Sequence, residues 1–177
     1  MAILFTILGR GRAGRALAGA WGDRVALLPA SASPEGLVLL AVPDRALAEC
    51  AARFPGRCAH LSGSFHLDGV PSAHPLTSFD GKAADWTGTP LGLTGPVPEP
   101  ILGAFLELGF IPFELPAERK ALYHACAVLT SCHSSALWLG AAGRTGPFVR
   151  GDAATIARDA AALPEDWREI FLRLGGY

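Results

Sequence analysis

The sequence predicts an α/β fold, with a mostly parallel sheet followed by a short helical region at the C-terminal end. Strand-like and helix-like stretches alternate up to about residue 115, as in sheets built from strand–helix–strand crossovers. The stretch 37–42 is apolar at every position, which is typical of a strand buried on both faces of a sheet. The last third of the chain has helical patterns.

Turn residues and apolar periodicity define the expected elements. The expected strands are 2–8, 23–28, 37–42, 57–61, 89–94 and 111–115, with a short extended piece within 71–79. The expected helices are 15–21, 44–53, 98–108, 117–142, 152–163 and a last one from Pro164 to Gly175-Gly176, with Asp44 as an N-cap, Gly109 as a C-terminal turn residue and a break at 143–146. About eight residues separate the second and third strands, whereas a parallel crossover needs roughly a dozen or more. We therefore expect the helix of this crossover to be missing or reduced to a turn.

A glycine-rich turn follows the first strand directly. Gly9-Arg10-Gly11-Arg12-Ala13-Gly14 matches the pattern G-x-G-x-x-G, with a strand before it and a helix after it. The first glycine allows a tight turn, the second lets a pyrophosphate approach the backbone, and the third lets the helix pack closely on the strand. The N–H groups at the start of the helix then face an anion. The pattern predicts a dinucleotide site; the alternative is a tight turn in a fold that binds nothing.

Composition and charge limit the classes of partner. The chain has 177 residues, of which 50% are apolar and 18% charged, enough for one domain or for one domain with a small appendage. A net charge of −1 provides no basic field for nucleic acid or an anionic membrane, and no apolar run reaches the roughly 18 residues of a membrane span. The first apolar stretch is short and has no basic region or cleavage site, so we interpret it as a strand and expect a cytoplasmic protein. The four cysteines, Cys50, Cys58, Cys126 and Cys132, form no C-x-x-C pair and are expected to be reduced thiols.

Three further stretches lie at the carboxyl ends of expected strands, where open parallel sheets bind ligands. Ala41-Val42-Pro43 is either a loop that contacts a ligand or a turn that needs proline. Ser62-Gly63 offers a hydroxyl and an open backbone to a substrate oxygen or a nicotinamide amide, or else forms a plain turn. His74 precedes a proline, which favours extended geometry. It is a candidate acid or base because histidine titrates near neutrality, and alternatively a hydrogen-bonded loop residue.

The end of the second strand bears on the kind of nucleotide. An acidic residue there would bind a ribose 2′-hydroxyl and indicate NAD, but 29–33 has no carboxylate and the first one is Glu35. Arg10 and Arg12 could meet a 2′-phosphate with their guanidinium groups, which favours NADP. The alternative is that both arginines are solvated surface charges.

His124, Cys132 and His133 lie on the expected long helix. No two of them have the i, i+4 spacing of helical metal ligands, so we expect no metal site. Cys132 and His133 are sequence neighbours that point to different sides of a helix, which disfavours a Cys–His nucleophile. Helix packing is the alternative role of these residues.

Six stretches, taken in order, are similar to one family. They are 8–14, 40–44, 60–63, 74–79, 114–116 leading into 121–125, and 146–155. They resemble the Rossmann-like proteins that carry a DUF2520 domain, which are relatives of pyrroline-5-carboxylate reductase, prephenate dehydrogenase and 6-phosphogluconate dehydrogenase. The resemblance covers most of the chain. It implies an NAD(P)-binding domain at 1–115, a truncated helical dimerisation domain at 116–177, and a homodimer formed through the C-terminal helices.

The chain departs from this family in its helical parts. The helix after the second strand is missing, and a segment between about 140 and 145 is deleted. Ser131-Cys132-His133 stands where relatives have Ser-Asn-Tyr. A Lys and an Asn that lie four apart in the wider superfamily would fall at Val128 and Cys132, so this chain has neither.

Two functions remain open at this point. The resemblance implies an NADP-dependent oxidoreductase acting on a small imino, keto or hydroxy acid. Its catalytic residues would be His74, Ser62 and His124, and its cofactor contacts would be 9–14, 41–43 and Ser62-Gly63. The alternative is a non-catalytic Rossmann-like dimeric protein, with a binding or regulatory role, that has lost turnover. No charged clamp for a carboxylate or phosphate stands out in the sequence, so the substrate remains unknown.

Overall fold

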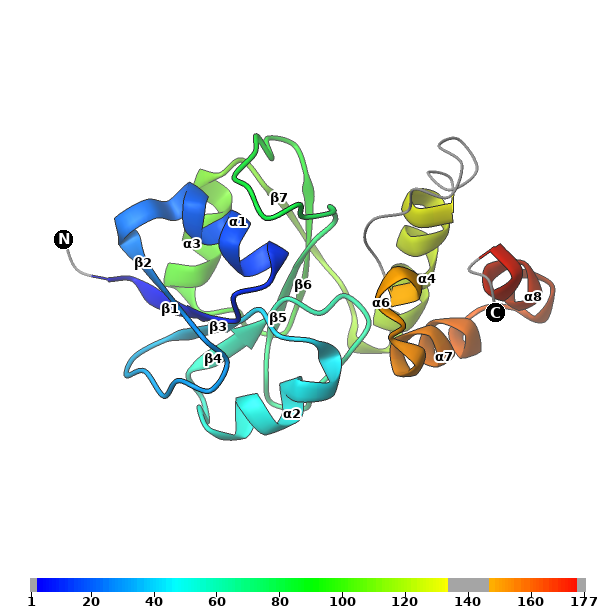
Figure 1. The fold of residues 1–177 in the computed structure, drawn as a ribbon, viewed down its shortest axis with the longest axis horizontal. Helices are drawn as coiled ribbons and strands as arrows, with labels where there is room; N and C mark the ends of the chain where they lie inside the picture. The colour runs from blue at the N-terminus through cyan, green and yellow to red at the C-terminus, as the bar shows by residue number, and fades with distance from the viewer. Residues whose placement is uncertain (1–2, 134–146, 175–177) are drawn as a thin grey trace. The chain divides into compact units, whose positions relative to one another are not determined.

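The computed structural model describes residues 3–133 and 147–174 (Figure 1). The chain forms two compact units, with residues 1–62 and 66–116 in unit 1 and residues 63–65 and 117–177 in unit 2. The short segment 63–65 thus belongs to unit 2, although it follows a strand of unit 1. Within the described ranges, no helix is both long and apolar enough to cross a membrane.

Unit 1 is built on a seven-stranded sheet with the order β2-β1-β3-β4-β5-β6-β7. The strands are β1 (Phe5–Leu8), β2 (Val25–Leu28), β3 (Val38–Leu40), β4 (Cys58–His60), β5 (Ser72–Pro75), β6 (Pro90–Thr94) and β7 (Ile111–Glu114). Strands β1 to β5 are parallel, β6 runs antiparallel to β5, and β7 is parallel to β6. This topology confirms the predicted α/β class with a mostly parallel sheet.

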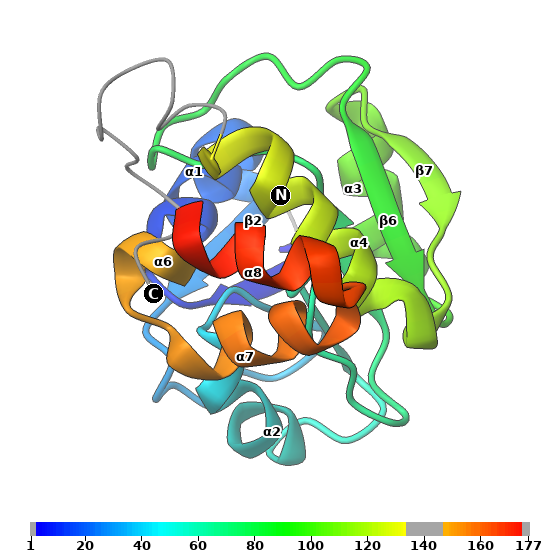
Figure 2. The same ribbon diagram turned by 90° about the vertical axis from the view of Figure 1, so that its right-hand side faces the viewer.

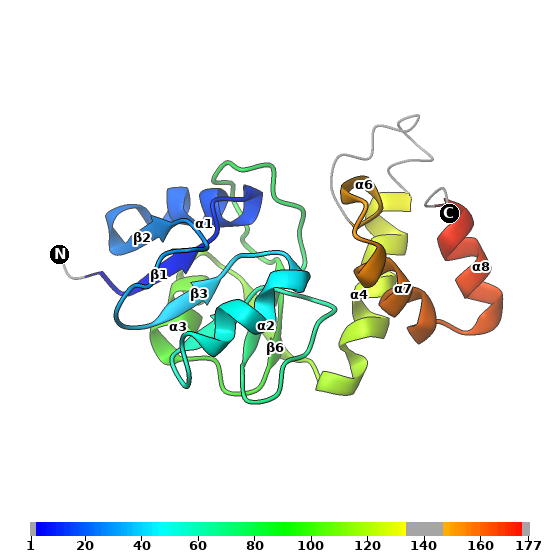
Figure 3. The same cartoon turned by 60° about the horizontal axis from the view of Figure 1, so that its bottom comes forward.

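Helices cover both faces of the sheet in unit 1. α1 (Arg12–Trp21) and α3 (Glu99–Glu107) lie on one face, and α2 (Asp44–Ala52) lies on the other (Figures 1 and 3). The Trp21 indole N–H donates to the carbonyl of Ala104 at 2.9 Å and so joins α1 to α3. An aromatic cluster fills this face, with neighbouring ring centroids 5.1–5.8 Å apart: Phe5, Trp21, Phe79, Trp86, Phe105 and Phe110. Because aromatic rings bury much apolar area, the cluster holds α1 firmly against β1.

The connection from β2 to β3 has no helix, as the sequence predicts. Two arginines from the end of α2 and the turn after it, Arg53 and Arg57, hold this connection in place. Their guanidinium groups lie 5.0 and 4.9 Å from the ring centroid of the buried Phe54. They donate hydrogen bonds of 2.7–3.0 Å to the carbonyls of Ala30, Ala32, Pro34 and Gly36. The arginines thereby satisfy backbone acceptors that a helix would have bonded internally.

Most elements of unit 1 begin or end one to three residues from the expected bounds, and α1 begins at Arg12 and not at Arg15. Pro43, and not Asp44, is the N-cap of α2, so Asp44 is the first helical residue. A carboxylate in the first turn still interacts favourably with the helix dipole. β2 begins at Val25 because the residues before it form a 3₁₀ turn, η1 (Gly22–Arg24).

Unit 2 is helical, with α4 (Lys120–Val128), α6 (Pro147–Arg150), α7 (Ala153–Ala162) and α8 (Glu165–Leu174) (Figure 2). Its core consists of Ala125, Val128, Ile156, Ala160, Leu163 and Phe171. Asp152 caps α7 by accepting a hydrogen bond from the backbone N–H of Thr155. The helix expected over 152–163 is therefore present with only its end residues changed.

The prediction of one regular helix over 117–142 is wrong for the described part, residues 117–133. This part starts with a 3₁₀ turn, η2 (Ala117–Arg119), and α4 then passes into a π-helical turn, η3 (Leu129–His133). The hydroxyls of Thr130 and Ser131 donate to backbone carbonyls of the preceding turn and compete with the regular helix pattern. The remainder of that helix, the break at 143–146, the deletion near 140–145 and the chain end at Gly175-Gly176 lie outside the described residues.

Candidate functional site

The glycine turn connects the carboxyl end of β1 to the start of α1, where the chain reverses direction. An ideal Cβ placed on Gly9, whose φ is +118°, would lie 2.2 Å from the carbonyl oxygen of Ala41. A Cβ on Gly14 would lie 2.0 Å from the carbonyl oxygen of Gly9. A Cβ on Gly11 would meet nothing within 4 Å. Two of the glycines are thus required by close packing of the protein on itself, and the third faces open space.

The first turn of α1 carries several basic side chains. Arg10 and Arg12 are exposed. Ala13, which follows Arg12, is half-buried. Arg15 donates from Nη1 to the carbonyl of Arg10 at 3.0 Å and so fixes the shape of the turn. Backbone N–H groups at a helix start, together with guanidinium groups, favour a bound phosphate.

The loop between β5 and β6 reaches this same turn. A Cβ on Gly81 would lie 3.3 Å from Nη2 of Arg15 and 3.9 Å from Cα of Arg12. Further along α1, a Cβ on Gly19 would lie 3.8 Å from Cβ of Ala83. The loop therefore runs along the exposed side of α1 and limits the space around the glycine turn on that side.

The predicted Ala41-Val42-Pro43 loop lies beside the glycine turn. Ala41 donates its N–H to the carbonyl of Leu8 at 2.8 Å, and Gly9 packs against its carbonyl. β1 lies between β2 and β3, so the chain leaves the carboxyl ends of β1 and β3 in opposite directions across the sheet. Ligands bind at such a topological switch point in open α/β sheets. The structure brings two of the predicted cofactor-contacting stretches together at this point.

His74 and Ser62 lie at the ends of the neighbouring strands β5 and β4. Nδ1 of His74 donates to the carbonyl of Leu61 at 2.8 Å, and this acceptor fixes the proton on Nδ1. Ser62 donates its backbone N–H to Nδ1 of the buried His60 at 3.2 Å. The segment that follows β4 therefore carries the Ser62 hydroxyl, and its Leu61 carbonyl orients the imidazole of His74 on the neighbouring strand β5.

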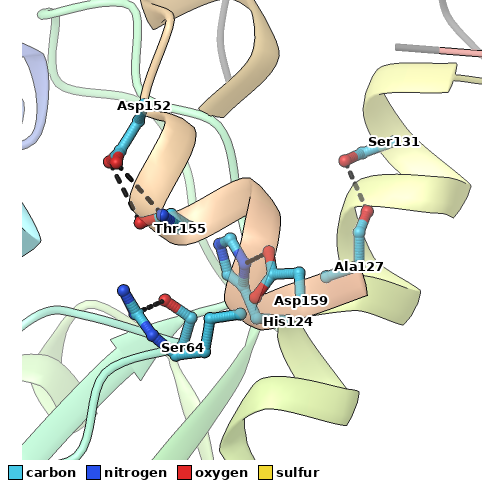
Figure 4. Close-up of polar contacts among 8 residues, drawn as sticks. Ser64, His124, Ala127, Ser131, Asp152, Thr155 and Asp159 are labelled. Carbon is cyan, nitrogen blue, oxygen red and sulfur yellow. Dashed lines mark hydrogen bonds and ion pairs between the residues drawn. The ribbon is translucent and has the colours of Figure 1, made fainter. Parts of the chain in front are cut away.

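Residues 63–65, which belong to unit 2, contact α7. Gly63 is buried, and Ser64 is 4% exposed. Nη1 of Arg158 donates to Oγ of Ser64 at 2.9 Å, and the guanidinium carbon lies 5.1 Å from the ring centroid of Phe65. Figure 4 shows Ser64 near the α7 residues of this unit.

His124 forms a close pair with a buried carboxylate. Its Nδ1 lies 2.6 Å from Oδ2 of Asp159, whose side chain is fully buried, while the His124 side chain is 16% exposed (Figure 4). The carboxylate on one ring nitrogen fixes the orientation of the imidazole. Burial raises the pKa of the Tyr123 phenol, so this neighbour of His124 stays protonated at neutral pH.

Among the residues that the structure describes, no group of three or more His, Cys, Asp or Glu side chains could hold a metal ion. The side chains of Cys132 and His133 lie outside the described set. A shallow hollow of about 360 Å³ lies over β6 and β7, lined by Leu93, Gly95, Pro112, Phe113 and Glu114, and none of the predicted site residues lines it.

No local pattern in the sequence indicates Asp159, Arg158, Ser64 or His60 as contacts of the predicted site residues. Asp159 lies 35 residues from its partner His124, and Arg158 lies 94 residues from Ser64. Helical periodicity alone does not indicate such pairs, because it places residues on a face without showing what the face contacts. The charged pair Arg158-Asp159 within an otherwise alanine-rich helix is the feature of the sequence that could have indicated the partner of His124.

Comparisons with known proteins identify solved structures that have a similar fold. No protein-family model matches the sequence, and no curated protein matches it, so the DUF2520 resemblance is not confirmed. Among solved structures, a Bacteroides fragilis protein described as a candidate NADP oxidoreductase is similar, with a TM-score of 0.61 and 15% identity over 97% of this chain and 96% of that one. Prephenate dehydrogenase from Aquifex aeolicus has a TM-score of 0.57 and 13% identity over 98% of this chain and 84% of that one.

A third similar structure is a protein from Thermotoga maritima, with a TM-score of 0.53 and 17% identity over 97% of this chain and 98% of that one. At these identities the similarity establishes the fold. The chain has a Rossmann-like α/β fold, followed by a helical C-terminal region.

Proposed function

We propose that this protein is an NADP-dependent oxidoreductase, related to the DUF2520 proteins, that acts on small imino, keto or hydroxy acids. The observation that carries the proposal is the contrast between Gly11 and the other two glycines of the turn. Gly11 is the N-cap of α1 with φ −71°, a conformation open to any residue, and no protein atom crowds it. Glycine caps a helix less well than Asp, Asn or Ser. A glycine that the protein's own packing does not need is explained by a ligand that approaches the backbone there.

The residues around the turn fit a dinucleotide phosphate. In this proposal the N–H groups of 11–14 hold the pyrophosphate, and Arg10 and Arg12 hold the 2′-phosphate. Ala41-Val42-Pro43 contacts the ribose and nicotinamide, and the Ser62-Gly63 backbone contacts the nicotinamide amide. When bound, NADPH supplies a hydride to the carbon of a C=N or C=O bond.

His74 is the proposed proton donor. Its Nδ1–H is committed to the carbonyl of Leu61, so Nε2 is the nitrogen that exchanges a proton with the substrate. In this step the imidazolium form of His74 gives its Nε2 proton to the substrate nitrogen or oxygen and becomes the neutral Nδ1–H form, and a proton from water then restores the imidazolium. The Ser62 hydroxyl binds the same substrate atom, and His124 is a second candidate donor.

We also propose a homodimer formed through unit 2. Trp167 is 56% exposed and Ile170 is 46% exposed, and their spacing places both on one face of α8. Val149 on α6 is 51% exposed. Large apolar side chains gathered on one unit are typical of a protein interface.

The alternative function is a non-catalytic dimeric protein with a binding or regulatory role. The observation that favours it is the helix-free β2–β3 connection, because that region normally adjoins the adenosine half of a dinucleotide. The absence of Lys at 128 and of Asn at 132 favours it too. The two functions differ in whether the glycine turn binds NADPH.

The test compares Gly11→Asp with Gly11→Asn. Both side chains are good N-caps, so both variants should match or exceed the melting temperature of the original protein. The carboxylate repels a phosphate, whereas the isosteric amide carries no charge. We expect micromolar NADPH binding, followed by nucleotide fluorescence, to be lost in Gly11→Asp and better retained in Gly11→Asn. Absence of NADPH and NADH binding by the original protein up to millimolar concentration would refute the oxidoreductase and favour the alternative.

A further inference from the structure

Two histidines on neighbouring strands of unit 1 are hydrogen-bonded to the same peptide group. His60 is the last residue of β4, and His74 lies on β5, which pairs with β4 in parallel. Nδ1 of His74 lies 2.8 Å from the carbonyl oxygen of Leu61. The backbone N–H of Ser62 donates to Nδ1 of His60 at 3.2 Å. Because this carbonyl and this N–H are the two polar ends of one planar peptide bond, the 61–62 peptide has an imidazole partner at each end.

These two hydrogen bonds assign opposite tautomers to the two imidazoles. A carbonyl oxygen can only accept, so Nδ1 of His74 carries a proton. A backbone N–H can only donate, so Nδ1 of His60 carries none, and the proton of this neutral ring is on Nε2. The bond from Ser62 therefore requires the neutral form of His60.

His60 occupies a rigid position at the end of β4. Its residue is 1% exposed, and its backbone N–H donates to the carbonyl of Pro71 at 3.0 Å. The next N–H, that of Leu61, donates to the carbonyl of Leu40 on β3 at 3.2 Å. Backbone pairing with the neighbouring strand therefore fixes the chain up to Leu61, and the imidazole of His60 supplies the acceptor for the N–H that follows.

We propose that His60 is a positioning residue for His74, the proposed proton donor, and that it acts through the 61–62 peptide. This inference rests on the proposed function. By accepting the N–H of Ser62, His60 orients and polarises the peptide, which makes the Leu61 carbonyl a stronger acceptor. The carbonyl keeps one proton of His74 on Nδ1, so the proton that passes to the substrate leaves from Nε2. His60 itself gains and loses no proton in this step.

The two tautomers can be measured on the full chain, without nucleotide or substrate. Long-range ¹H–¹⁵N NMR correlation spectra of the imidazole rings, recorded at about pH 8, where unperturbed histidine is neutral, distinguish Nδ1–H from Nε2–H. In the original protein we expect Nε2–H at His60 and Nδ1–H at His74, each favoured by about tenfold or more. The opposite tautomer at either ring would overturn the proposal.

Substitutions of His60 test whether it acts on His74. His60→Leu fills the buried site without a hydrogen-bond acceptor, whereas His60→Gln retains an acceptor in its amide oxygen. In His60→Leu we expect the Ser62 amide to exchange with solvent about tenfold or more faster, and the Nδ1–H preference of His74 to fall about threefold or more. His60→Gln should restore most of both values. A His74 preference within about twofold of the original in His60→Leu, or equal losses in both variants, would overturn the proposal.

His66→Leu is the matched control, because His66 is exposed and pairs with the exposed Asp68. It should leave the tautomers of His60 and His74 unchanged. If His60→Leu does not fold, the reciprocal variant His74→Phe decides the result, because position 74 is only half-buried. Loss of the donor to the Leu61 carbonyl should make the Ser62 amide exchange about threefold or more faster. Exchange within about twofold of the original would overturn the proposal.

NADPH titration of the same samples separates this proposal from the proposed function. NADPH binding by the original protein, together with the expected tautomers and their change in His60→Leu, is the supporting result. An original protein that binds NADPH but has a His74 tautomer independent of His60 refutes the positioning role alone. One whose two imidazoles are linked as expected but that binds no nucleotide retains the peptide link and refutes the oxidoreductase.

Discussion

Nδ1 of His124 lies 2.6 Å from the fully buried Oδ2 of Asp159, and this pair joins α4 to α7 within unit 2. A second His–Asp pair, His66 and Asp68, has its atoms at 3.0 Å on the surface, where the Asp68 side chain is completely exposed. The same two residue types therefore occur in a buried and an exposed setting in one chain, and the second pair is a natural control for the first.

We expect Asp159→Ala to destabilise unit 2 far more than Asp68→Ala destabilises the protein. Removal of the buried carboxylate leaves an imidazole donor without its acceptor, which costs about 1–3 kcal/mol. An exposed pair contributes about 0–1 kcal/mol, because water screens it. Urea unfolding followed by circular dichroism measures both, and equal effects of the two substitutions would contradict the buried pairing.

Alanine substitutions in the glycine turn should separate packing from ligand approach. Gly9→Ala and Gly14→Ala place Cβ 2.2 and 2.0 Å from backbone oxygens, so the backbone must shift. We expect each to cost about 2 kcal/mol or more in stability, by analogy with overpacked and strained sites. Gly11→Ala has no such contact and should change the melting temperature little while it weakens NADPH binding. A large loss of stability in Gly11→Ala would mean that all three glycines serve the fold.

The β2–β3 connection should depend on Arg53. Its Nη2 donates to the carbonyls of Ala30 and Ala32, so Arg53→Ala leaves two acceptors without their donor. We expect a loss of about 1–3 kcal/mol and faster amide hydrogen exchange across 29–37. Arg45→Ala, at an exposed position on α2, is the control and should stay within about 0.5 kcal/mol.

Thiol reactivity should follow burial. Burial raises the pKa of the Cys58 thiol, against a smaller opposite effect of the Arg57 charge, so the thiolate is disfavoured in the folded protein. Cys126 is exposed. Iodoacetamide at about pH 8.5, near the ordinary thiol pKa, should modify Cys126 rapidly and Cys58 only on unfolding, as peptide mass spectrometry can measure.

The raised pKa of the Cys58 thiol makes the free energy of unfolding depend on pH. The folded-state pKa of Cys58 lies above the unfolded value, so its stabilising contribution is complete below about pH 8.5 and is lost as the pH rises through the folded-state pKa. Cys58→Val removes this ionisation. The variant should show a flatter decline of unfolding free energy above about pH 8.5. An identical slope in both proteins would show that the Cys58 thiol does not titrate in this range.

Much of unit 1 could be predicted because its strands and turns follow from apolar runs and glycine spacing within a few consecutive residues. The strands at 5–8 and 38–40 are apolar at every residue except Thr6, and the glycine turn between strand and helix has the geometry that its spacing indicates. The missing helix before β3 was predicted because too few residues were available. The reversal of β6 against β5 was not anticipated, since a strand pattern carries no direction.

The candidate site in unit 2 was harder to predict because its contacts are long-range. His124 was selected for its chemistry alone, and nothing in the sequence indicated Asp159 as its partner. In the π-helical turn after Val128, the hydroxyls of Thr130 and Ser131 donate to carbonyls three or four residues earlier, where they compete with the backbone N–H groups. Apolar periodicity does not detect this competition, and it led to the expectation of one continuous helix.

The arginine-held connection between β2 and β3 also sets an order of assembly. The carbonyls at 30–36 bond to guanidinium groups that lie 21 or 23 residues later in the chain. During synthesis, β1, α1 and β2 leave the ribosome before Arg53 and Arg57, so the carbonyls of this connection lack their side-chain donors at that stage. Because a domain generally folds as a unit, the connection gains these hydrogen bonds only when the residues at the end of α2 have joined it.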